Sequence, residues 1–245
     1  MIPRTAKTYI AFVIASGTML LILAVGWWSS TNLGQFALYL GLVALASALK
    51  VRIPGLEATV SPNFVFLLLA MVALPFSQIV AVSLAAALVQ SLWRSAKRPR
   101  LVQVAFSIAT LIVSSSAAYA FSHFVLNAVG MQSPVACAIV AGTIYFPLNS
   151  VLVSVVVGLV DGQPLRQVSQ HCYEWVFPYF MGGIAFVGLI SGAYIPSAIW
   201  KGALELIPAA ALAHLYFLNR SGVPLPASLP VSSREEEEYP EEVHI

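Results

Sequence analysis

The chain has 245 residues, of which 59% are hydrophobic and only 9% are charged, with a formal net charge of +2. Soluble domains carry about 25% charged residues, so this composition excludes a globular surface facing water. A mean hydropathy of +0.87 agrees. We therefore predict an all-α, polytopic transmembrane helical bundle in one compact domain, with the lipid bilayer as its main partner and no nucleic acid.

Eight apolar runs are predicted as membrane-spanning helices, since a helix needs ~17–25 residues to cross the hydrocarbon core. The runs are continuously apolar rather than alternating, which disfavours strands. The first run is too long for a signal peptide and lacks a convincing cleavage site, so it is predicted to be retained. The predicted spans are Tyr9–Trp28, Leu33–Leu49, Val60–Phe76, Ser77–Trp93, Leu101–Val125, Val135–Val160, Trp175–Ile195 and Ser197–Leu218.

The third and fourth runs meet at Leu74 to Gln78 with almost no connecting loop. Both are short, at the lower limit for a full crossing. A hairpin that crosses twice and a re-entrant pair that dips partway return the chain to the same side, so both remain open. A re-entrant pair needs protein around it, because irregular backbone cannot face lipid.

Lysine and arginine are unevenly distributed among the connectors. With a cytoplasmic N-terminus and eight crossings, eleven of the twelve cations fall on inner connectors and only Lys201 falls toward the outside. Because these residues are retained on the cytoplasmic side, we predict two cytoplasmic termini and a bacterial inner-membrane location. The inner cations are Arg4, Lys7, Lys50, Arg52, Arg94, Lys97, Arg98, Arg100, Arg166, Arg220 and Arg234.

Two inner connectors are basic enough to meet anionic lipid headgroups. Topology anchoring is the simpler interpretation, and binding of a phosphate-bearing ligand is the alternative, although no Gly-rich loop accompanies either connector. The cations concerned are Lys50 and Arg52 in the first connector, and Arg94, Lys97, Arg98 and Arg100 in the second.

The chain divides into a transmembrane domain, residues 1–218, and a tail, residues 219–245. The tail is rich in proline and serine and then acidic, with six of the ten carboxylates of the chain. Such a composition predicts disorder. The simpler interpretation is a solvated tail; the alternative is a docking strip for a basic cytoplasmic partner.

Ionisable residues inside spans are costly and are therefore candidates for a ligand site. Lys201 and Glu205 lie on one face of the last predicted span. Glu205 lies about 12 Å along the helix from Ser197, too deep to reach water easily. It is predicted to pair with Lys201, to be hydrated by a cavity, or to be protonated. His214 is more often a helix contact than a ligand in such a place.

Polar residues in other spans add weaker candidates for a cavity. Asn63 lies near the start of the third span, after a serine and a proline that suit a helix start; it is predicted to bond nearby backbone or to face a cavity or partner helix. Asn149 follows Pro147, which is expected to kink the sixth span. Ser114–Ser116 can bond within their own helix. Close helix approach is predicted at Gly182, Gly183, Gly188 and Gly192.

No catalytic motif is present: the sequence holds no HExxH, no Walker loop and no nucleophile elbow. The two cysteines, Cys137 and Cys172, form no disulfide framework or metal quartet. His171, Cys172 and Glu174 are adjacent, but a metal site needs three or four converging ligands. We therefore expect no enzyme activity, no metal and no cofactor.

Two segments, "ALASALKVRIPGLEATVSPNFVFLLLAM" and "LVQSLWRSAKRPRLVQVAF", carry a "KVRIPG" turn and a tryptophan with a basic cluster. Over about residues 33–111 the chain resembles the membrane-sensor region found ahead of diguanylate-cyclase or HD-type phosphohydrolase domains in acidobacterial proteins. The resemblance implies a signal-input module. Because only the acidic tail follows, its output domain is expected in another chain.

Three functions are consistent with these patterns. The first is a non-enzymatic ligand-sensing module that acts on a separate cytoplasmic signalling partner. The second is a small-solute transporter, or the membrane subunit that binds substrate for one, with a mid-membrane cavity around Glu205, Asn149 and Asn63. The third is a membrane scaffold. A cavity lined by polar groups favours the first two, and a dry, fully paired core favours the third.

Overall fold

The computed structural model describes residues 3–29, 32–49, 51–52, 59–60, 63–93, 99–131, 133–162 and 165–192. Within these ranges the protein consists of helices and one short antiparallel pair of strands. The elements are α1 Arg4–Gly26, α2 Leu33–Ala48, β1 Val51–Arg52, β2 Thr59–Val60, α3 Asn63–Ala73, α4 Phe76–Leu92, α5 Leu101–Ala128, α6 Pro134–Asp161 and α7 Leu165–Gly192.

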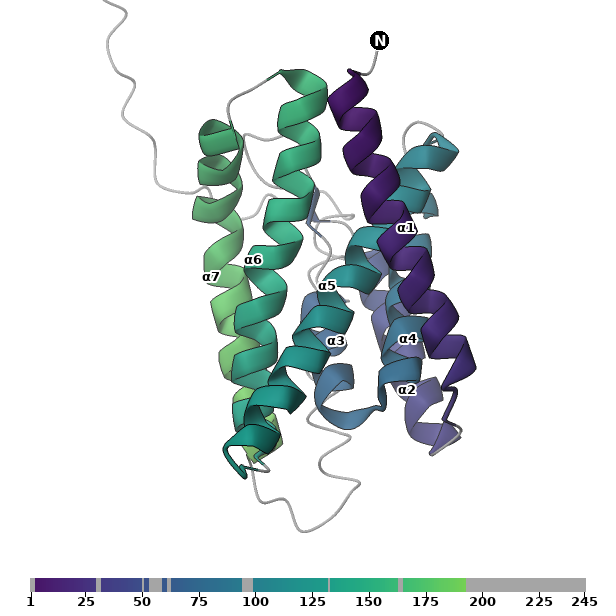
Figure 1. Cartoon of the computed structure of the whole chain (residues 1–245). Helices are drawn as coiled ribbons and strands as arrows, with labels where there is room; N and C mark the ends of the chain where they lie inside the picture. Colours follow the sequence, from purple (N-terminus) through teal and green to yellow (C-terminus); the bar gives the residue numbers. More distant parts are fainter. Residues whose placement is uncertain are drawn as a thin grey trace, which may run out of the picture.

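The helices form a bundle in which successive helices run in opposite directions (Figure 1). Three of them are long and apolar enough to cross a membrane: Arg4–Gly26, Leu101–Ala128 and Pro134–Val160, with mean hydropathies of 2.2, 1.8 and 1.9. Large apolar side chains such as Phe12, Leu45 and Phe124 are exposed on the outside of the bundle. This is the fold of an all-helical membrane protein, as the composition predicts.

The short helix α3 lies in the middle of the bundle and packs against α2, α4, α6 and α7. Eight of its eleven residues are buried. At 1.5 Å per residue it is about 16 Å long, roughly half the hydrocarbon thickness of a bilayer. The predicted third span, Val60–Phe76, is therefore longer than the helix that forms. Pro75 explains the early end, because the residue before a proline is disfavoured in helical geometry.

The α3–α4 turn is covered by the connection that follows α1. The backbone N–H of Ser29 donates to the Oγ of Ser77 over 3.1 Å, and Gln78 Nε2 donates to the Ser29 carbonyl over 3.0 Å. Ser77 and Gln78 are both buried, with 3% and 0% of their surface exposed. The tip of this helical hairpin is thus attached to protein rather than projecting freely.

Several helix ends follow from their local sequence. Asn32 adopts a left-handed conformation (φ 49°) before α2 and accepts from the Gln35 N–H. Ser133 caps α6 by accepting from the Ala136 N–H, with Pro134 in the first helical position, where its missing N–H costs nothing. Gly162 ends α6 with a φ of 68°. The helix continues through Pro147.

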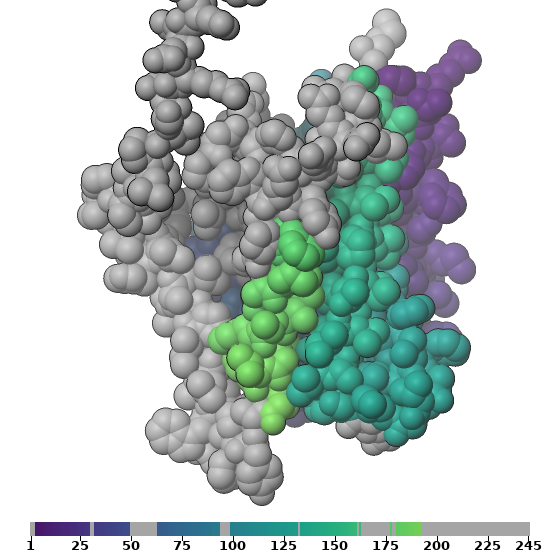
Figure 2. Space-filling view, turned by 90° about the vertical axis from the view of Figure 1, so that its left-hand side faces the viewer, coloured from purple at the N-terminus to yellow at the C-terminus, as the bar shows by residue number. Residues whose placement is uncertain are grey.

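The described helices overlap the first seven predicted spans, but α3 is shorter than its span and α7 begins earlier than its span. α7 begins at Leu165, ten residues before the predicted start at Trp175. The polar segment before Trp175 contains no glycine or proline between Leu165 and Glu174, so nothing in it stops a helix from extending beyond the apolar run. α7 lies side by side with α6 (Figure 2). The predicted eighth span, Ser197–Leu218, lies outside the described residues.

Helices α1 and α5 approach each other closely at a glycine. A Cβ atom on Gly17 would lie 2.6 Å from the Cα of Ala109. Val13, Phe106 and Ala109 form a small apolar cluster beside this crossing, and Tyr9, Leu152 and Val156 pack against it. The cluster therefore joins α1, α5 and α6.

Candidate functional site

A cluster of aromatic rings joins α3, α6 and α7 in the core. The ring centroids of Phe64 and Phe180 are 4.1 Å apart, those of Phe146 and Phe180 are 4.5 Å apart, and those of Phe64 and Tyr145 are 5.3 Å apart. Phe64, Tyr145, Phe146 and Phe180 are all buried. The contact with Tyr145 places the start of α3 beside the middle of α6.

Asn149 lies one turn beyond Tyr145, on the same side of α6 as Leu152 and Val156. These residues recur at intervals of four, three and four, the spacing of one helix face. Leu152 and Val156 pack against the cluster that Phe106 and Ala109 of α5 form with α1. The face that carries Asn149 therefore meets α3 and α7 at Tyr145, and α1 and α5 at Leu152 and Val156.

The register between α5 and α6 is set by Cys137, whose Sγ donates to the Oγ of Ser122 over 3.8 Å. The two helices run in opposite directions (Figure 1). Because the helices are antiparallel, a move back along α5 from Ser122 corresponds to an equal move forward along α6 from Cys137. This register pairs Ser114 with Tyr145, and Thr110 with Asn149. On α5, Ala109 faces α1 and Ser115 bonds Ser83 of α4. Thr110 and Ser114 lie between these two positions around the helix.

We call Thr110, Ser114 and Asn149 the polar seam. Thr110 and Ser114 have 1% and 0% of their surface exposed, while Asn149 is half-buried. The buried atoms Thr110 Oγ1, Ser114 Oγ and Asn149 Oδ1 have no hydrogen-bond partner within the described part of the chain. A buried polar group left without a partner costs about 1–3 kcal/mol. The seam therefore requires partners from outside these residues.

The hydroxyl of Ser115, which neighbours Ser114 on α5, does have hydrogen-bond partners. Ser115 Oγ donates to the Leu111 carbonyl over 2.7 Å. The Ser83 and Ser115 hydroxyls are 2.7 Å apart, which joins α4 to α5. This confirms the prediction of bonding within the helix for Ser115. Ser114 and Ser116 lack such a bond among the described residues.

Asn63 joins three helices at the start of α3. Its Nδ2 donates to Ser47 Oγ of α2 over 3.1 Å and to Gln90 Oε1 of α4 over 3.5 Å. Only 6% of its surface is exposed. Of the two alternatives for Asn63, contact with partner helices is the one that these bonds show. Because Phe64 contacts Tyr145, both Asn63 and Asn149 lie at the same end of the aromatic cluster.

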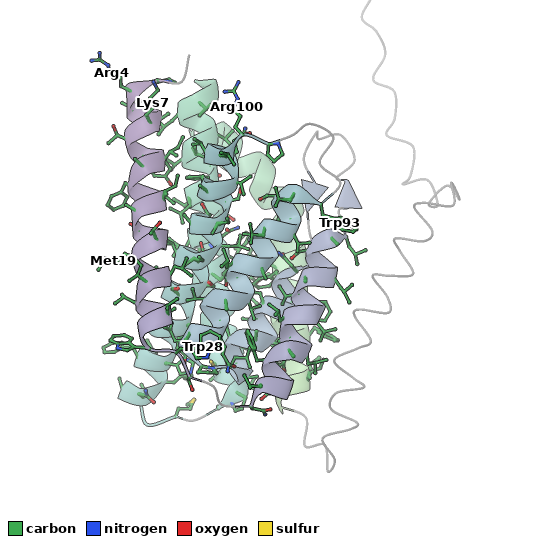
Figure 3. The ribbon with its side chains drawn as sticks, turned by 90° about the vertical axis from the view of Figure 1, so that its right-hand side faces the viewer. Arg4, Lys7, Met19, Trp28, Trp93 and Arg100 are labelled. Atoms are coloured by element: carbon green, nitrogen blue, oxygen red, sulfur yellow. The ribbon has the colours of Figure 1, made fainter. Side chains whose placement is uncertain are left out.

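Several of the other predicted site residues lie outside the described residues. Glu205, Lys201 and His214 lie outside the described residues, as do Lys50, Arg94, Lys97 and Arg98. Arg52 lies in β1, where only its backbone is described. Arg100 is exposed immediately before α5 and lies at the same end of the bundle as Arg4 and Lys7 (Figure 3). Trp28 lies at the opposite end (Figure 3).

The chemistry of the seam is that of neutral hydrogen bonding. Its hydroxyls and amide do not ionise near neutral pH, so they can hold or orient a molecule but cannot exchange protons with it as acids or bases. No group of three histidine, cysteine, aspartate or glutamate residues that could hold a metal occurs within the described residues. The side chains of His171, Cys172 and Glu174 are not among those described.

Thr110 was not identified from the sequence, although Asn149 was. Its signal is its position: Gln103, Ser107, Thr110 and Ser114 recur at intervals of four, three and four on one face of α5. That pattern identifies a polar face, but the facing helix is known only from the structure.

Comparison with known proteins adds no relative. No family model matches the chain, and neither a curated protein nor a solved structure matches it significantly.

Proposed function

We propose that this protein is a non-enzymatic, ligand-sensing module of a bacterial inner membrane, which acts on a separate cytoplasmic partner. One observation carries the proposal: three buried oxygens of the polar seam lack hydrogen-bond partners among the described residues, near the middle of a membrane-embedded bundle. Ser114 lies about 20 Å along α5 from its first residue. Polar groups at such depth mark sites that meet water or a ligand.

A purely structural scaffold fits this pattern less well. A scaffold gains nothing from buried oxygens that are left unsatisfied, each of which costs about 1–3 kcal/mol. Binding sites, in contrast, are mostly apolar with a few placed polar groups. The aromatic cluster beside Tyr145 and the polar seam next to it match that description.

A solute transporter, or its substrate-binding subunit, is the second candidate, and α3 is the observation that favours it. Transporters form midplane sites with helices that are interrupted within the bilayer. α3 is short, central and surrounded by protein. The neighbouring Asn63 and Asn149 are then part of the same binding region, with Glu205 a further candidate.

For the topology we propose eight membrane segments with both termini cytoplasmic, in which α3 and α4 form a hairpin that crosses to the end of the bundle marked by Trp28. The hydrogen bonds that join Ser77 and Gln78 at the hairpin tip to Ser29, next to Trp28, support this crossing alternative over a pair that dips partway. The exposed residues Arg4, Lys7 and Arg100 mark one end of the bundle (Figure 3), and the retention of cations on the cytoplasmic side assigns that end to the cytoplasm. There they meet anionic lipid headgroups.

Native mass spectrometry of the full chain, released from detergent micelles after purification, tests the sensing proposal. We expect a non-covalently bound small molecule on the wild-type protein, and loss of that molecule from Asn149→Leu. Asn127→Leu makes the same substitution at an exposed position on α5 and should keep it. Thr110→Val replaces the hydroxyl with a methyl group of similar size and should also lose the molecule.

An unoccupied wild-type protein, or equal occupancy in all variants, would overturn the proposal. The molecule identified by mass then separates sensing from transport. In proteoliposomes a sensor binds it without accumulating it, whereas a transporter moves it into the vesicle interior.

A further inference from the structure

Three exposed cations lie at one end of the bundle, at the starts of two neighbouring helices. Arg4 and Lys7 belong to the first two turns of α1, and Arg100 directly precedes α5 (Figure 3). The two helices begin at the same end and meet where Gly17 packs on Ala109. Moving back by the same number of residues along each helix places Lys7 level with the residue before Arg100. The three cations therefore belong to one surface, which we call the basic end.

Neither helix start brings a carboxylate to the basic end. α1 and α5 have no acidic residue in their first turns, and the start of a helix itself carries a partial positive charge. The transmembrane domain, residues 1–218, holds ten lysine and arginine residues but only four aspartate and glutamate residues. The domain is therefore cationic overall, and its basic end attracts anions.

The helices that end where α1 and α5 begin are followed by further cations. Successive helices alternate in direction, so α2 and α4 end on the side of the bundle where α1 and α5 start (Figure 1). In the sequence, Lys50 follows the last residue of α2 by two positions, and Arg94 follows the last residue of α4 by two. The chain thus supplies basic residues directly after these helix ends as well.

The largest concentration of negative charge in the chain lies in the tail. Residues 235–242 contain six glutamates and no lysine or arginine. The sixteen residues 219–234 that precede them can span up to about 50 Å, which is about five helix diameters. The acidic segment can therefore reach the basic end from any helix that ends on the same side of the membrane. A covalent tether of this length gives the segment an effective concentration on the order of 1 mM.

We propose that residues 235–242 dock on the basic end of their own bundle, and that anionic lipid headgroups displace them. Single exposed ion pairs contribute little, but six tethered carboxylates act together against several cations. Anionic headgroups attract the same cations and repel the tail. A bilayer with few anionic lipids therefore favours the docked tail, and an anionic bilayer favours its release.

The docked state is autoinhibitory toward a basic cytoplasmic partner, because the acidic segment is then not available to that partner. The inference goes beyond ligand sensing and uses none of the residues of the polar seam. It rests on the proposed topology, since the tail must lie on the side of the membrane that carries Arg100.

Distances between two spin labels on the full chain, measured by pulsed electron paramagnetic resonance in nanodiscs, test the docking. The native cysteines are replaced in Cys137→Ala and Cys172→Ala. One label is placed at Leu101→Cys, which is 87% exposed beside Arg100, and the other at Tyr239→Cys within the acidic segment. The nanodiscs contain phosphatidylcholine alone, or an equal mixture of phosphatidylcholine and phosphatidylglycerol.

In phosphatidylcholine we expect a short, narrow distribution of distances between the two labels. The distribution should shift to longer distances in the anionic mixture, and also in about 1 M salt, where the Debye length falls to ~3 Å. Changing the six glutamates of residues 235–242 to glutamine should give the longer distances in phosphatidylcholine too.

Substitutions on α1 supply the matched comparison at the basic end. Arg4→Gln combined with Lys7→Gln should lengthen the distances in phosphatidylcholine, because two of the docking cations are lost. Thr5→Gln changes an exposed, uncharged position between them and should leave the distribution as it is.

Equal distributions for the glutamate and glutamine tails in phosphatidylcholine would overturn the docking, and a short distance that persists in the anionic mixture would refute displacement by lipid. If docking fails, an impermeant maleimide on Tyr239→Cys locates the error. Reaction from the side that carries Arg100 leaves the topology standing and removes only the docking, whereas reaction from the opposite side refutes both. Neither result alters the mass-spectrometric test of ligand sensing.

Discussion

Phe64 of α3 and Phe180 of α7 pack with their ring centroids 4.1 Å apart. Their contact connects the central helix to the last helix described, across more than a hundred residues of sequence. Gly183 lies next to the same ring, since a Cβ atom there would be 3.1 Å from Phe64 Cδ1. The short central helix is thus held in place by close packing on its α7 side.

Phe64→Ala should destabilise the protein more than any exposed aromatic substitution does. Removing a buried phenylalanine typically costs about 3–5 kcal/mol. Phe124→Ala is the matched control, because Phe124 is 72% exposed on α5, where substitutions usually change stability by less than about 0.5 kcal/mol. Thermal unfolding in detergent should give a lower midpoint for Phe64→Ala alone. Equal midpoints would show that α3 is not held by this cluster.

Gly17→Ala should loosen the contact between α1 and α5. The added Cβ would lie 2.6 Å from the backbone Cα of Ala109, which cannot rotate away. Overpacking of this kind costs about 1–3 kcal/mol. Gly41→Ala makes the same change where no atom of the described residues lies within 4 Å, and it should leave the melting midpoint unchanged. A loss of stability in both variants, or in neither, would contradict the close approach.

Asn63 and Ser47 should show an energetic coupling. The single variants Asn63→Ala and Ser47→Ala, together with the double variant, form a cycle around the 3.1 Å hydrogen bond. Hydrogen bonds between membrane helices average about 0.6 kcal/mol by this method, so the two effects should fall short of additivity by about that amount. Ser16 is exposed and bonds its own helix. Combining Ser16→Ala with Asn63→Ala should give no coupling, and equal coupling in the two cycles would argue against the bond.

Labelling of single cysteines at the two ends of the bundle should reveal its orientation. Arg4 and Arg100 lie at one end (Figure 3), and the exposed Met131 follows α5 at the other. With an impermeant maleimide on intact cells whose outer membrane has been permeabilised, Met131→Cys should be labelled. Arg4→Cys and Arg100→Cys should react only after the inner membrane is opened. Labelling of Arg100→Cys and Met131→Cys from the same side would be incompatible with α5 crossing the membrane.

Much of the helical layout could be predicted from composition and helix-breaking residues alone. The start of α2 at Leu33 and of α5 at Leu101 coincide with the predicted starts, because each follows a polar or basic connector. The length and central position of α3 could not be predicted. An apolar run has the same composition whether lipid or protein surrounds it, and only the packing of α2, α4, α6 and α7 around α3 distinguishes the two.

The site was predictable only where a polar residue interrupts an apolar run. Asn63 and Asn149 stand out for that reason, but the partners of Asn63, Ser47 and Gln90, lie on other helices. Among the glycines, Gly183 and Gly192 make the predicted close approaches, to Phe64 and Val135, whereas Gly182 has no described neighbour within 4 Å. Close approach depends on which side of a helix meets a neighbour, which glycine spacing does not encode.

The position of α1 has a consequence for biosynthesis. α1 packs against α5, α4 and α6, all of which leave the ribosome after it. Only 17% of its most apolar window is buried, and its mean hydropathy of 2.2 is the highest of the three long helices. A helix so apolar is stable alone in the bilayer. α1 can therefore remain in the bilayer as a separately inserted helix until the later helices are inserted. Assembly of the native bundle cannot finish before α5 has been synthesised.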